Sequence, residues 1–514
     1  MDFRKIARDI HHSSEVIMNP NSEELREMAR KDEVTTEFGS ASYVTRIKNR
    51  SAKATEVIED KPSDEQIKVI EDVVKFLKGK KLLCLQKTMG NNPKMKLHCR
   101  TYVTADYARF LYQWDKTLFP GDMDKEPDMI TIIVPEFPKL KIIVDARSYT
   151  TFVLGSDYFG ECKKSNLRMA MHIMKKRGGL GLHAATKLIR VIDAYENFGE
   201  KGFVLFGLSG TGKTSLSLHD HDLKGKEGIT VRQDDVVLMD KTGYCYGTED
   251  GFYLKTEGLE PSQHVLYEAA TSPNAVFENI YVDENGRVDF LDYRLTDNGR
   301  GVVLRREIKE TDEEVDLKRT DAIIFITRRD DVVPPVAKLN QEQAAAAFML
   351  GESIETSAGD PTKAGQAVRV VGTNPFIIGP LHEEGHRFLE ILKKNSEIEC
   401  FLLNTGHVGG KVNGDKITVK DSATILREIA RDSIKWKHDP NWGYEIAASV
   451  PGVDSKKLDP SNYYSEDEYK ALVKKLREER KAWMSKFPEL DSGVVMALTK
   501  EDVDNNQVRA QQIP

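Results

Sequence analysis

Two stretches of the chain repeat hydrophobic positions with the period of an amphipathic helix. In residues 63–79, Ser63 and Gln66 form a capping box and Gly79 marks the end. The apolar face of this helix consists of Ile67, Ile70, Val73, Val74 and Leu77. In residues 465–487, a capping box of Ser465 and Glu468 precedes a stripe of Tyr469, Leu472, Val473, Leu476 and Trp483. Such a stripe is typical of core packing, so we expect this helix to be structural.

Short apolar runs elsewhere in the chain are typical of buried strands. They occur at residues 81–85, 130–134, 141–146, 229–235, 321–327, 400–404 and 416–419. A further helical fragment is expected near residues 22–29. The combination of helices and strands predicts an α/β protein.

One more apolar strand, at residues 203–206, leads into a glycine-rich turn and then a helix start with the sequence GLSGTGKTSLSL. The turn matches the phosphate-loop pattern GxxxxGK[ST], with Gly207, Gly212, Lys213 and Thr214 in the fixed positions. Glycines allow backbone N–H groups to surround phosphate oxygens, and the helix adds its positive N-terminal end. Lys213 is expected to neutralise the terminal phosphates, and the Thr214 hydroxyl to bind magnesium. The sequence therefore predicts a nucleoside triphosphate site.

Paired carboxylates follow the predicted strand at residues 229–235. Asp234 and Asp235 end the run ITVRQDD, which is the usual place for a metal-binding aspartate beside a phosphate loop. Taken alone, the pair is equally compatible with a solvated acidic turn.

Composition narrows the classes of partner. Of the 514 residues, 75 are basic and 82 acidic, and the net charge of -7 is spread along the chain without a basic block, so no nucleic-acid partner is expected. No apolar run approaches the roughly 20 residues that span a membrane, and the first residues do not resemble a signal peptide. The five cysteines are scattered and form no CxxC pair, which suits a reducing compartment. We expect a cytoplasmic protein with small-molecule substrates; the oligomeric state is left open.

The length predicts two large domains. The boundary is expected just before the nucleotide-binding strand, giving a substrate-binding α/β domain at residues 1–195 and a phosphate-loop domain of mixed sheet and helices at residues 196–514.

Several motifs together resemble ATP-dependent phosphoenolpyruvate carboxykinase. Besides the phosphate loop, the similar segments are SDYFGECKKS, LGLHAA, GFYLKT, TDNGR, the run from IIFITRRDD to KLNQEQ, LLNTGHVGG, KITVKDS and PGVDSKKLDPSNYY. They span about residues 155–465 in the family order. The resemblance implies the two-domain fold of that family. It also implies decarboxylation of oxaloacetate to an enolate, which takes the terminal phosphate of ATP to give phosphoenolpyruvate and ADP.

By this resemblance Lys164, His183 and Asp235 would hold Mn²⁺, and Thr214 would hold Mg²⁺ together with the phosphates. A mixture of nitrogen and oxygen ligands suits manganese better than magnesium. Lysine ligates a metal only when deprotonated, so Lys164 is expected to lie in a desolvated place beside the cation. The implied catalytic residues are Lys164, Arg300, Lys213 and Asp235.

The resemblance also implies nucleotide contacts. The phosphate-loop contacts are Gly207, Leu208, Ser209, Gly210, Thr211, Gly212, Lys213 and Thr214. Lys255 matches a further phosphate contact and Glu260 an acidic position of the family. Lys416, Ile417 and Ser422 fall where the family carries an arginine, an isoleucine and a threonine beside the base and ribose. Residues 351–372, with Gly351, Gly359, Gly365 and Gly372, align with a mobile lid.

The pattern breaks at the substrate-binding turn. The chain has MGNNPKMK where the family has TGRSPKDK, so Asn91 replaces an arginine that holds the carboxylate of oxaloacetate. Asparagine carries no charge, and a charged contact is roughly twice as strong as a neutral one. Arg100 is the candidate replacement, and Tyr158 matches a tyrosine of the same pocket. The expected substrate-binding set is Asn91, Arg100, Tyr158, Lys164 and Arg300. Two further hypotheses stay open: a kinase on the same core that phosphorylates another small molecule or a protein, and a non-catalytic nucleotide-binding regulator.

Overall fold

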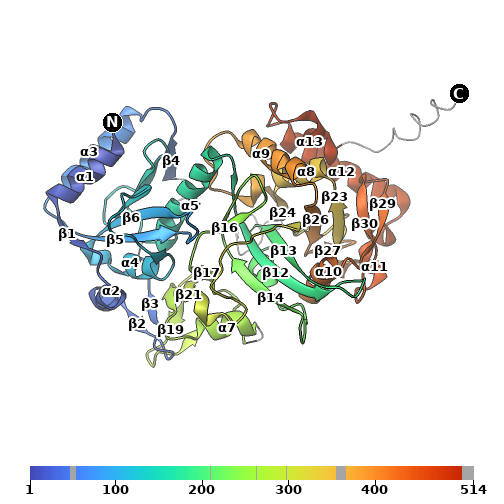
Figure 1. The fold of residues 1–514 in the computed structure, drawn as a ribbon, viewed down its shortest axis with the longest axis horizontal. Helices are drawn as coiled ribbons and strands as arrows, with labels where there is room; N and C mark the ends of the chain where they lie inside the picture. Colours follow the sequence, from blue (N-terminus) through green and yellow to red (C-terminus); the bar gives the residue numbers. More distant parts are fainter. Residues whose placement is uncertain (47–53, 209, 262, 297, 355–365, 500–514) are drawn as a thin grey trace. The chain divides into compact units, whose positions relative to one another are not determined.

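The computed structural model describes residues 1–46, 54–208, 210–261, 263–296, 298–354 and 366–499. The chain divides into two compact units (Figure 1). Unit 1 consists of Met1–Lys176, Tyr246–Val315 and Phe376–Gly379, and unit 2 of Arg177–Cys245, Asp316–Pro375 and Pro380–Pro514. Residues 246–315 thus return to unit 1, whereas the expected division at residue 195 assigns them to the C-terminal domain. No helix among the described residues is long and apolar enough to cross a membrane.

Unit 1 contains a mixed sheet in the order β1-β5-β6-β8-β10-β9-β4, with β7 paired to β5. Its strands are β1 Glu15–Met18, β4 Thr55–Ile58, β5 Lys81–Met89, β6 Leu97–Thr104, β7 Phe119–Pro120, β8 Met129–Val134, β9 Lys141–Asp145 and β10 Thr150–Leu154. The helices of the unit are α1 Phe3–Ser13, α2 Ser22–Ala29, α3 Asp64–Leu77, α4 Arg109–Asp115, α5 Phe159–Lys176 and α7 His264–Ala270. Helix α3 has the predicted Ser63–Gln66 capping box, and Ile70, Val73 and Leu77 belong to the core that α1 and α3 form with this sheet.

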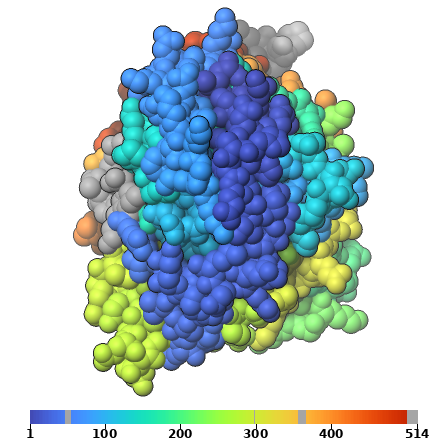
Figure 2. Space-filling model, turned by 90° about the vertical axis from the view of Figure 1, so that its left-hand side faces the viewer, coloured from blue at the N-terminus to red at the C-terminus, as the bar shows by residue number. Residues whose placement is uncertain are grey.

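The returning segment of unit 1 forms a second sheet in the order β17-β21-β18-β3-β2. The strands are β2 Val34–Thr35, β3 Ala41–Tyr43, β17 Gly251–Lys255, β18 Val276–Glu278 and β21 Arg300–Leu304, and a small hairpin joins β19 Tyr281–Val282 to β20 Val288–Asp289. Because β3 pairs with β18, the N-terminal segment and residues 246–315 lie side by side, and Figure 2 shows them as blue and yellow-green surfaces in contact.

Unit 2 is built on a sheet in the order β14-β12-β13-β22-β26-β23-β30-β29. Its strands are β12 Ala184–Ile192, β13 Phe198–Gly207, β14 Gly228–Gln233, β22 Ala322–Thr327, β23 Val336–Leu339, β26 Glu399–Asn404, β29 Lys435–Asp439 and β30 Tyr444–Ser449. Small sheets contain β11 Leu180–Leu182, β15 Val237–Met239 and β16 Cys245–Gly247, then β24 Glu352–Ile354 with β25 Ala367–Arg369, and β27 His407–Val408 with β28 Asp415–Lys416. The helices are α6 Lys213–Leu218, α8 Gln341–Leu350, α9 Leu381–Lys394, α10 Val419–Ala430, α11 Ser455–Leu458, α12 Glu466–Met484 and α13 Ser492–Ala497.

An aromatic cluster forms the core of unit 2 next to the phosphate loop. Phe206 of β13 and Phe325 of β22 stack with ring centroids 5.3 Å apart. Phe348 of α8 and Phe388 of α9 stack on each other at 4.6 Å and meet Phe206 edge-on. Stacked and edge-to-face pairs add to the free energy of burying these rings. The end of β13 that leads into the loop is therefore held by both α8 and α9.

Most of the predicted elements are confirmed, and one is wrong. The α/β class holds, and strands follow each predicted run up to residue 404. At residues 416–419, however, only Lys416 is in a strand, because Thr418 and Asp421 form a capping box that starts helix α10 at Val419. Local capping by polar side chains outweighed the short apolar pattern. All five cysteines are buried and free.

Candidate active site

The phosphate loop lies at one edge of the unit 2 sheet. Strands β13, β22 and β26 are parallel neighbours, so their carboxyl ends meet at the same edge, where open α/β sheets usually bind ligands. Two residues that follow β22 and β26 hold the loop. Arg328 Nη1 donates to Gly210 O at 3.0 Å, and Thr405 Oγ1 donates to Thr211 O at 2.7 Å.

Glycine is required in this loop for two different reasons. Gly210 and Gly212 have φ angles of 80° and 100°, in the left-handed region that other residues rarely adopt. At Gly207 the constraint is space, because a Cβ atom would lie 2.5 Å from Thr211 Oγ1. Helix α6 begins directly after Gly212, as the sequence pattern predicts. Ser209 lies outside the described residues.

Lys213 and Thr214 are held by the paired aspartates that follow β14. Lys213 Nζ lies 3.0 Å from Asp234 Oδ1 and 3.1 Å from Asp235 Oδ1. Thr214 Oγ1 donates to Asp234 Oδ2 at 2.8 Å. Burial alone would lower the pKa of Lys213, but the two carboxylates outweigh it and raise the pKa above its ordinary value. Lys213 is thus kept as a cation at the end of the phosphate loop.

His183, just before strand β12, meets the same aspartate. Its Nε2 lies 2.9 Å from Asp235 Oδ1, and its Nδ1 lies 2.7 Å from the carbonyl oxygen of Thr373. A carbonyl only accepts, so Nδ1 carries a hydrogen. Nε2 then either holds a second proton or directs its lone pair at a cation beside the carboxylate. This arrangement fits a metal ligand whose other nitrogen is oriented by a backbone carbonyl.

The predicted base-binding residues of unit 2 lie close to the phosphate loop in the fold. Lys416 is exposed at the end of β28, while Ile417 is buried and its N–H donates to Gly406 O at 2.9 Å. Ser422 lies in the first turn of α10, and its hydroxyl donates to Thr418 O at 3.2 Å.

In unit 1, the first turns of α5 carry a cationic group. Lys164 Nζ lies 2.8 Å from Glu161 Oε1 and 5.3 Å from the centre of the Tyr158 ring. The Tyr158 hydroxyl in turn accepts from Tyr253 OH at 3.2 Å. Three elements of this unit, α5, the loop before it and β17, therefore bring Lys164, Tyr158 and Tyr253 together.

Arg300 is the first residue of β21 and lies opposite charged residues on both neighbouring strands. It pairs in register with Lys255 on β17 and with Glu278 on β18. Like charges directly opposite each other destabilise a sheet, and here Lys255 also forms an ion pair with Glu257. Glu278 is buried, and its Oε1 accepts from the N–H of Phe159, the first residue of α5, at 3.0 Å. Burial raises the pKa of Glu278 to about 7 even though Arg109 opposes the shift.

The remaining predicted residues of unit 1 are more dispersed. Asn91 is exposed in the turn after β5, and Glu260 is exposed before α7. Arg100 lies on β6 next to Tyr102 and His11. Burial, the charge of His12 and, to a smaller extent, the charge of Arg100 lower the pKa of His11. The neighbouring Cys99 side chain faces Cys162 of α5 instead. Because successive side chains of a strand point to opposite faces, Arg100 lies on the face of the sheet away from α5.

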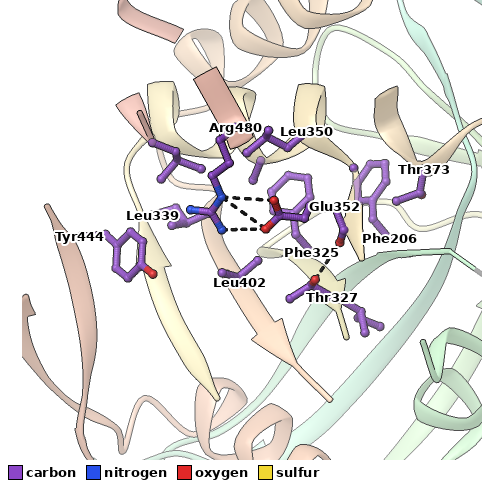
Figure 3. A pocket seen from close by; sticks show the side chains of 14 residues that line it. Phe206, Phe325, Thr327, Leu339, Leu350, Glu352, Thr373, Leu402, Tyr444 and Arg480 are labelled. Carbon is purple, nitrogen blue, oxygen red and sulfur yellow. Dashed lines mark hydrogen bonds and ion pairs between the residues drawn. The ribbon is translucent and has the colours of Figure 1, made fainter. Parts of the chain in front are cut away.

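A small cavity of about 30 Å³ lies within unit 2, lined by Phe206, Phe325, Leu402 and other apolar residues (Figure 3). At its wall, Glu352 pairs with Arg480 at 2.8 Å and with Arg369 at 2.7 Å. Burial would raise the pKa of Glu352, but the arginines hold it well below its usual range. Thr327 Oγ1 also donates to Glu352 O at 2.7 Å. The ion pairs and this hydrogen bond together hold Glu352, the first residue of strand β24.

Residues 355–365 of the expected lid, including Gly359 and Gly365, lie outside the described residues.

The comparison with known proteins identifies the family. The model of the family described as phosphoenolpyruvate carboxykinase matches residues 14–456. The chain belongs to this family. It is similar to the phosphoenolpyruvate carboxykinase (ATP) of Aeropyrum pernix, with 33% identity over 492 residues, 94% of this chain and 97% of that protein. The proteins of the same name from Brucella melitensis and Staphylococcus aureus are each 27% identical, over 82% and 84% of this chain and 79% and 82% of their own lengths.

Membership of the phosphoenolpyruvate carboxykinase family confirms the resemblance, the fold class and the prediction of an enzyme of this family. It does not favour the alternative of a kinase with another acceptor. The individual site residues stay predictions. Within the described part of the chain, no three His, Cys, Asp or Glu side chains gather as a metal-binding group, and the predicted ligand set includes a lysine and a threonine besides His183 and Asp235.

Several residues around the site were not found from the sequence. The sequence marks Asp234 only as half of an acidic pair, and it gives no signal for Thr373, Thr405 and Arg328. Each of these last three contributes one carbonyl, hydroxyl or guanidinium contact from a segment that is remote in the sequence. No local spacing pattern reports contacts of that kind.

Proposed function

We propose that this member of the phosphoenolpyruvate carboxykinase family converts oxaloacetate and ATP into phosphoenolpyruvate, CO₂ and ADP. Oxaloacetate loses CO₂, and the electron pair of the broken C–C bond becomes the enolate of pyruvate. The enolate oxygen then attacks the terminal phosphorus of ATP, and ADP leaves.

One observation carries this proposal: a single carboxylate oxygen connects the phosphate loop with the predicted metal ligand. Asp235 Oδ1 lies 3.1 Å from Lys213 Nζ and 2.9 Å from His183 Nε2. A site that handles both a phosphate and an enolate needs its phosphate-binding cation and its metal side by side. A phosphate loop that only binds nucleotide has no need of the imidazole.

The donor set supports a divalent cation with mixed nitrogen and oxygen ligands. By the family resemblance His183, Asp235 and Lys164 would hold Mn²⁺, and Thr214 would hold Mg²⁺ with the phosphates. When bound, these cations supply positive charge next to oxygens that gain negative charge during the reaction.

The chain's own residues would bind and orient the two substrates. The backbone N–H groups at residues 207–213 would bind the phosphates, with Lys213 neutralising the oxygens of the transferred group. By the family resemblance Arg300 and Lys255 would also contact anionic groups of the substrates, since a planar guanidinium suits phosphate and carboxylate oxygens. Tyr158 would donate its hydroxyl hydrogen to a substrate oxygen.

The test is phosphoenolpyruvate formation from oxaloacetate with ATP, Mn²⁺ and Mg²⁺, with GTP and pyrophosphate as alternative donors. We expect activity with ATP. In the Lys164→Ala variant the manganese-dependent rate should fall by about 10³-fold, because the metal loses a ligand, while ATP binding measured by calorimetry stays near wild type. Activity that survives this change would contradict the metal assignment. A wild-type protein that binds ATP and Mn²⁺ but forms no phosphoenolpyruvate would contradict the proposed reaction.

A further inference from the structure

Arg168 differs from every other buried cation in the described part of the chain. The buried lysines and arginines with a hydrogen-bonding or ionic partner are Lys87, Arg109, Lys141, Lys163, Lys187, Lys213, Arg305, Arg329, Arg477 and Arg480. Arg168 is only 6% exposed, and its buried Nη1 has no hydrogen-bond partner among the described residues. Its one close neighbour of note is the ring of Phe376, whose centre lies 5.8 Å from the guanidinium carbon.

Such an arrangement is costly. Arginine does not lose its proton in proteins, so a buried guanidinium without an anion retains the full cost of desolvation. Burial accordingly lowers the pKa of Arg168, and Glu161 opposes that shift only in part. The cation–π contact with Phe376 offsets only part of this cost. The fold therefore keeps a charge at this position that only an anion would compensate.

The position of Arg168 on α5 relates it to the predicted substrate site. Lys164 lies four residues earlier and Glu161 seven residues earlier, so the three side chains follow one face of the helix. Glu161 already pairs with Lys164 at 2.8 Å. Two cations thus share one carboxylate, and this face of α5 has an excess positive charge.

Two of the other residues expected to bind the substrate are less suitable for its carboxylate. Asn91 is exposed and neutral. Arg100 carries a charge, but it lies with His11 and Tyr102 on the opposite face of the β6 sheet from α5. Neither residue therefore brings positive charge to the face that carries Lys164.

We propose that Arg168 is the residue that binds a carboxylate group of the substrate, one helical turn from Lys164. This inference rests on the proposed function for the identity of the substrate, oxaloacetate. It does not depend on that function for the chemical class of the ligand, a small carboxylate. The bound carboxylate would accept hydrogen bonds from the guanidinium and balance the excess charge of the helix face.

Kinetics of Arg168→Met give the first test. KM for oxaloacetate should rise by about 100-fold, the effect of losing a charge-assisted hydrogen-bond pair, while the Kd of ATP stays unchanged. The KM of Arg168→Lys for oxaloacetate should lie between those of the wild type and Arg168→Met, because this variant keeps the charge and loses the planar pair of donors. Lys176→Met, an exposed lysine on the same helix, is the matched control for the loss of one positive charge and should behave as wild type.

Thermal unfolding gives a second readout that does not need turnover. Sodium oxalate should raise the Tm of the wild type and of Lys176→Met but not that of Arg168→Met, and sodium sulfate at equal ionic strength should do less. Without ligand, Arg168→Met should unfold at a higher temperature than wild type, because an uncompensated buried charge is gone.

Each outcome separates the two proposals. A wild type that forms no phosphoenolpyruvate but is stabilised by oxalate through Arg168 refutes the proposed reaction and supports the carboxylate site. Unchanged KM and unchanged oxalate stabilisation in Arg168→Met refute the carboxylate site. A lowered Tm of Arg168→Met with a retained response to oxalate would indicate a structural role and would also refute the carboxylate site. Stabilisation by sulfate equal to that by oxalate would indicate an unspecific anion site and would refute it as well.

Discussion

The charged residues of the two units are compensated in different ways. In unit 2, Lys213 lies between two carboxylates, His183 bonds to Asp235 and Thr373, and the buried Lys187 donates to neutral acceptors. In unit 1, Arg300 lies opposite Lys255 on one side and Glu278 on the other, whereas the buried Arg168 has no hydrogen-bond partner among the described residues. The phosphate site is thus electrostatically complete without a ligand, whereas the charge of Arg168 in unit 1 is not. Self-compensation stabilises the fold, and its absence marks a position where a ligand supplies the missing charge.

The largest expected effect comes from breaking the compensated set of unit 2. Lys213→Met should reduce kcat/KM for ATP by about 10³-fold, because the variant removes the charge that the transferred phosphate meets. The same variant leaves Asp234 and Asp235 facing each other without their shared cation. Steady-state kinetics measure the effect, and Lys224→Met on the surface is the control for the loss of one charge. A reduction below 10-fold would contradict the role of Lys213.

A buried lysine near the phosphate loop, Lys187, has a hydrogen-bond partner for each of its ammonium hydrogens. Lys187 Nζ donates to Leu216 O at 2.8 Å, to His219 O at 3.0 Å and to His221 Nε2 at 2.7 Å. His221 Nδ1 continues to Ala423 O at 2.8 Å, so Lys187 connects the end of α6 with helix α10. Burial lowers the pKa of Lys187 well below its ordinary value, but three acceptors match the three hydrogens of an ammonium group.

Lys187→Met should therefore lower the free energy of unfolding by about 3 kcal/mol, since it leaves three buried acceptors without a donor. The change in the free energy of unfolding thus has the opposite sign to the change expected for Arg168→Met. Urea denaturation of the two variants measures the difference, with Lys226→Met, an exposed surface lysine, as the control. If both variants were destabilised equally, the distinction between a compensated and an uncompensated cation would be refuted.

The smallest expected effect concerns Glu278, which lies opposite Arg300 and caps α5. Its pKa is raised from 4.5 to about 7, so the protonated form is favoured in the folded protein. A raised folded pKa contributes stability that is fully present below the unfolded pKa and is lost as pH rises through the folded pKa. The wild type should therefore lose about 2 kcal/mol relative to Glu278→Gln between pH 4.5 and pH 7. Urea denaturation at pH 5 and pH 8 measures this difference, and a difference independent of pH would contradict the prediction.

The local features of this protein could be predicted from the order of its amino acids. The phosphate loop, the capping box of α3 and the apolar strands follow from spacing over a few residues, because glycine φ angles, helix caps and hydrophobic periodicity are local properties. The order of several motifs also led to the family, which the comparisons confirm. Where two local signals competed, at residues 416–419, the capping box of α10 prevailed over the apolar run.

The partners of the charged residues, by contrast, follow from the folded structure. Spacing in the sequence does not reveal that Thr373 orients His183, that Thr405 holds Thr211, or that Lys187 meets His221. It equally does not reveal that residues 246–315 return to unit 1 and place Arg300 beside Glu278. These contacts join residues far apart in the chain, and the desolvation that makes an unpaired Arg168 costly exists only once the surrounding core has formed.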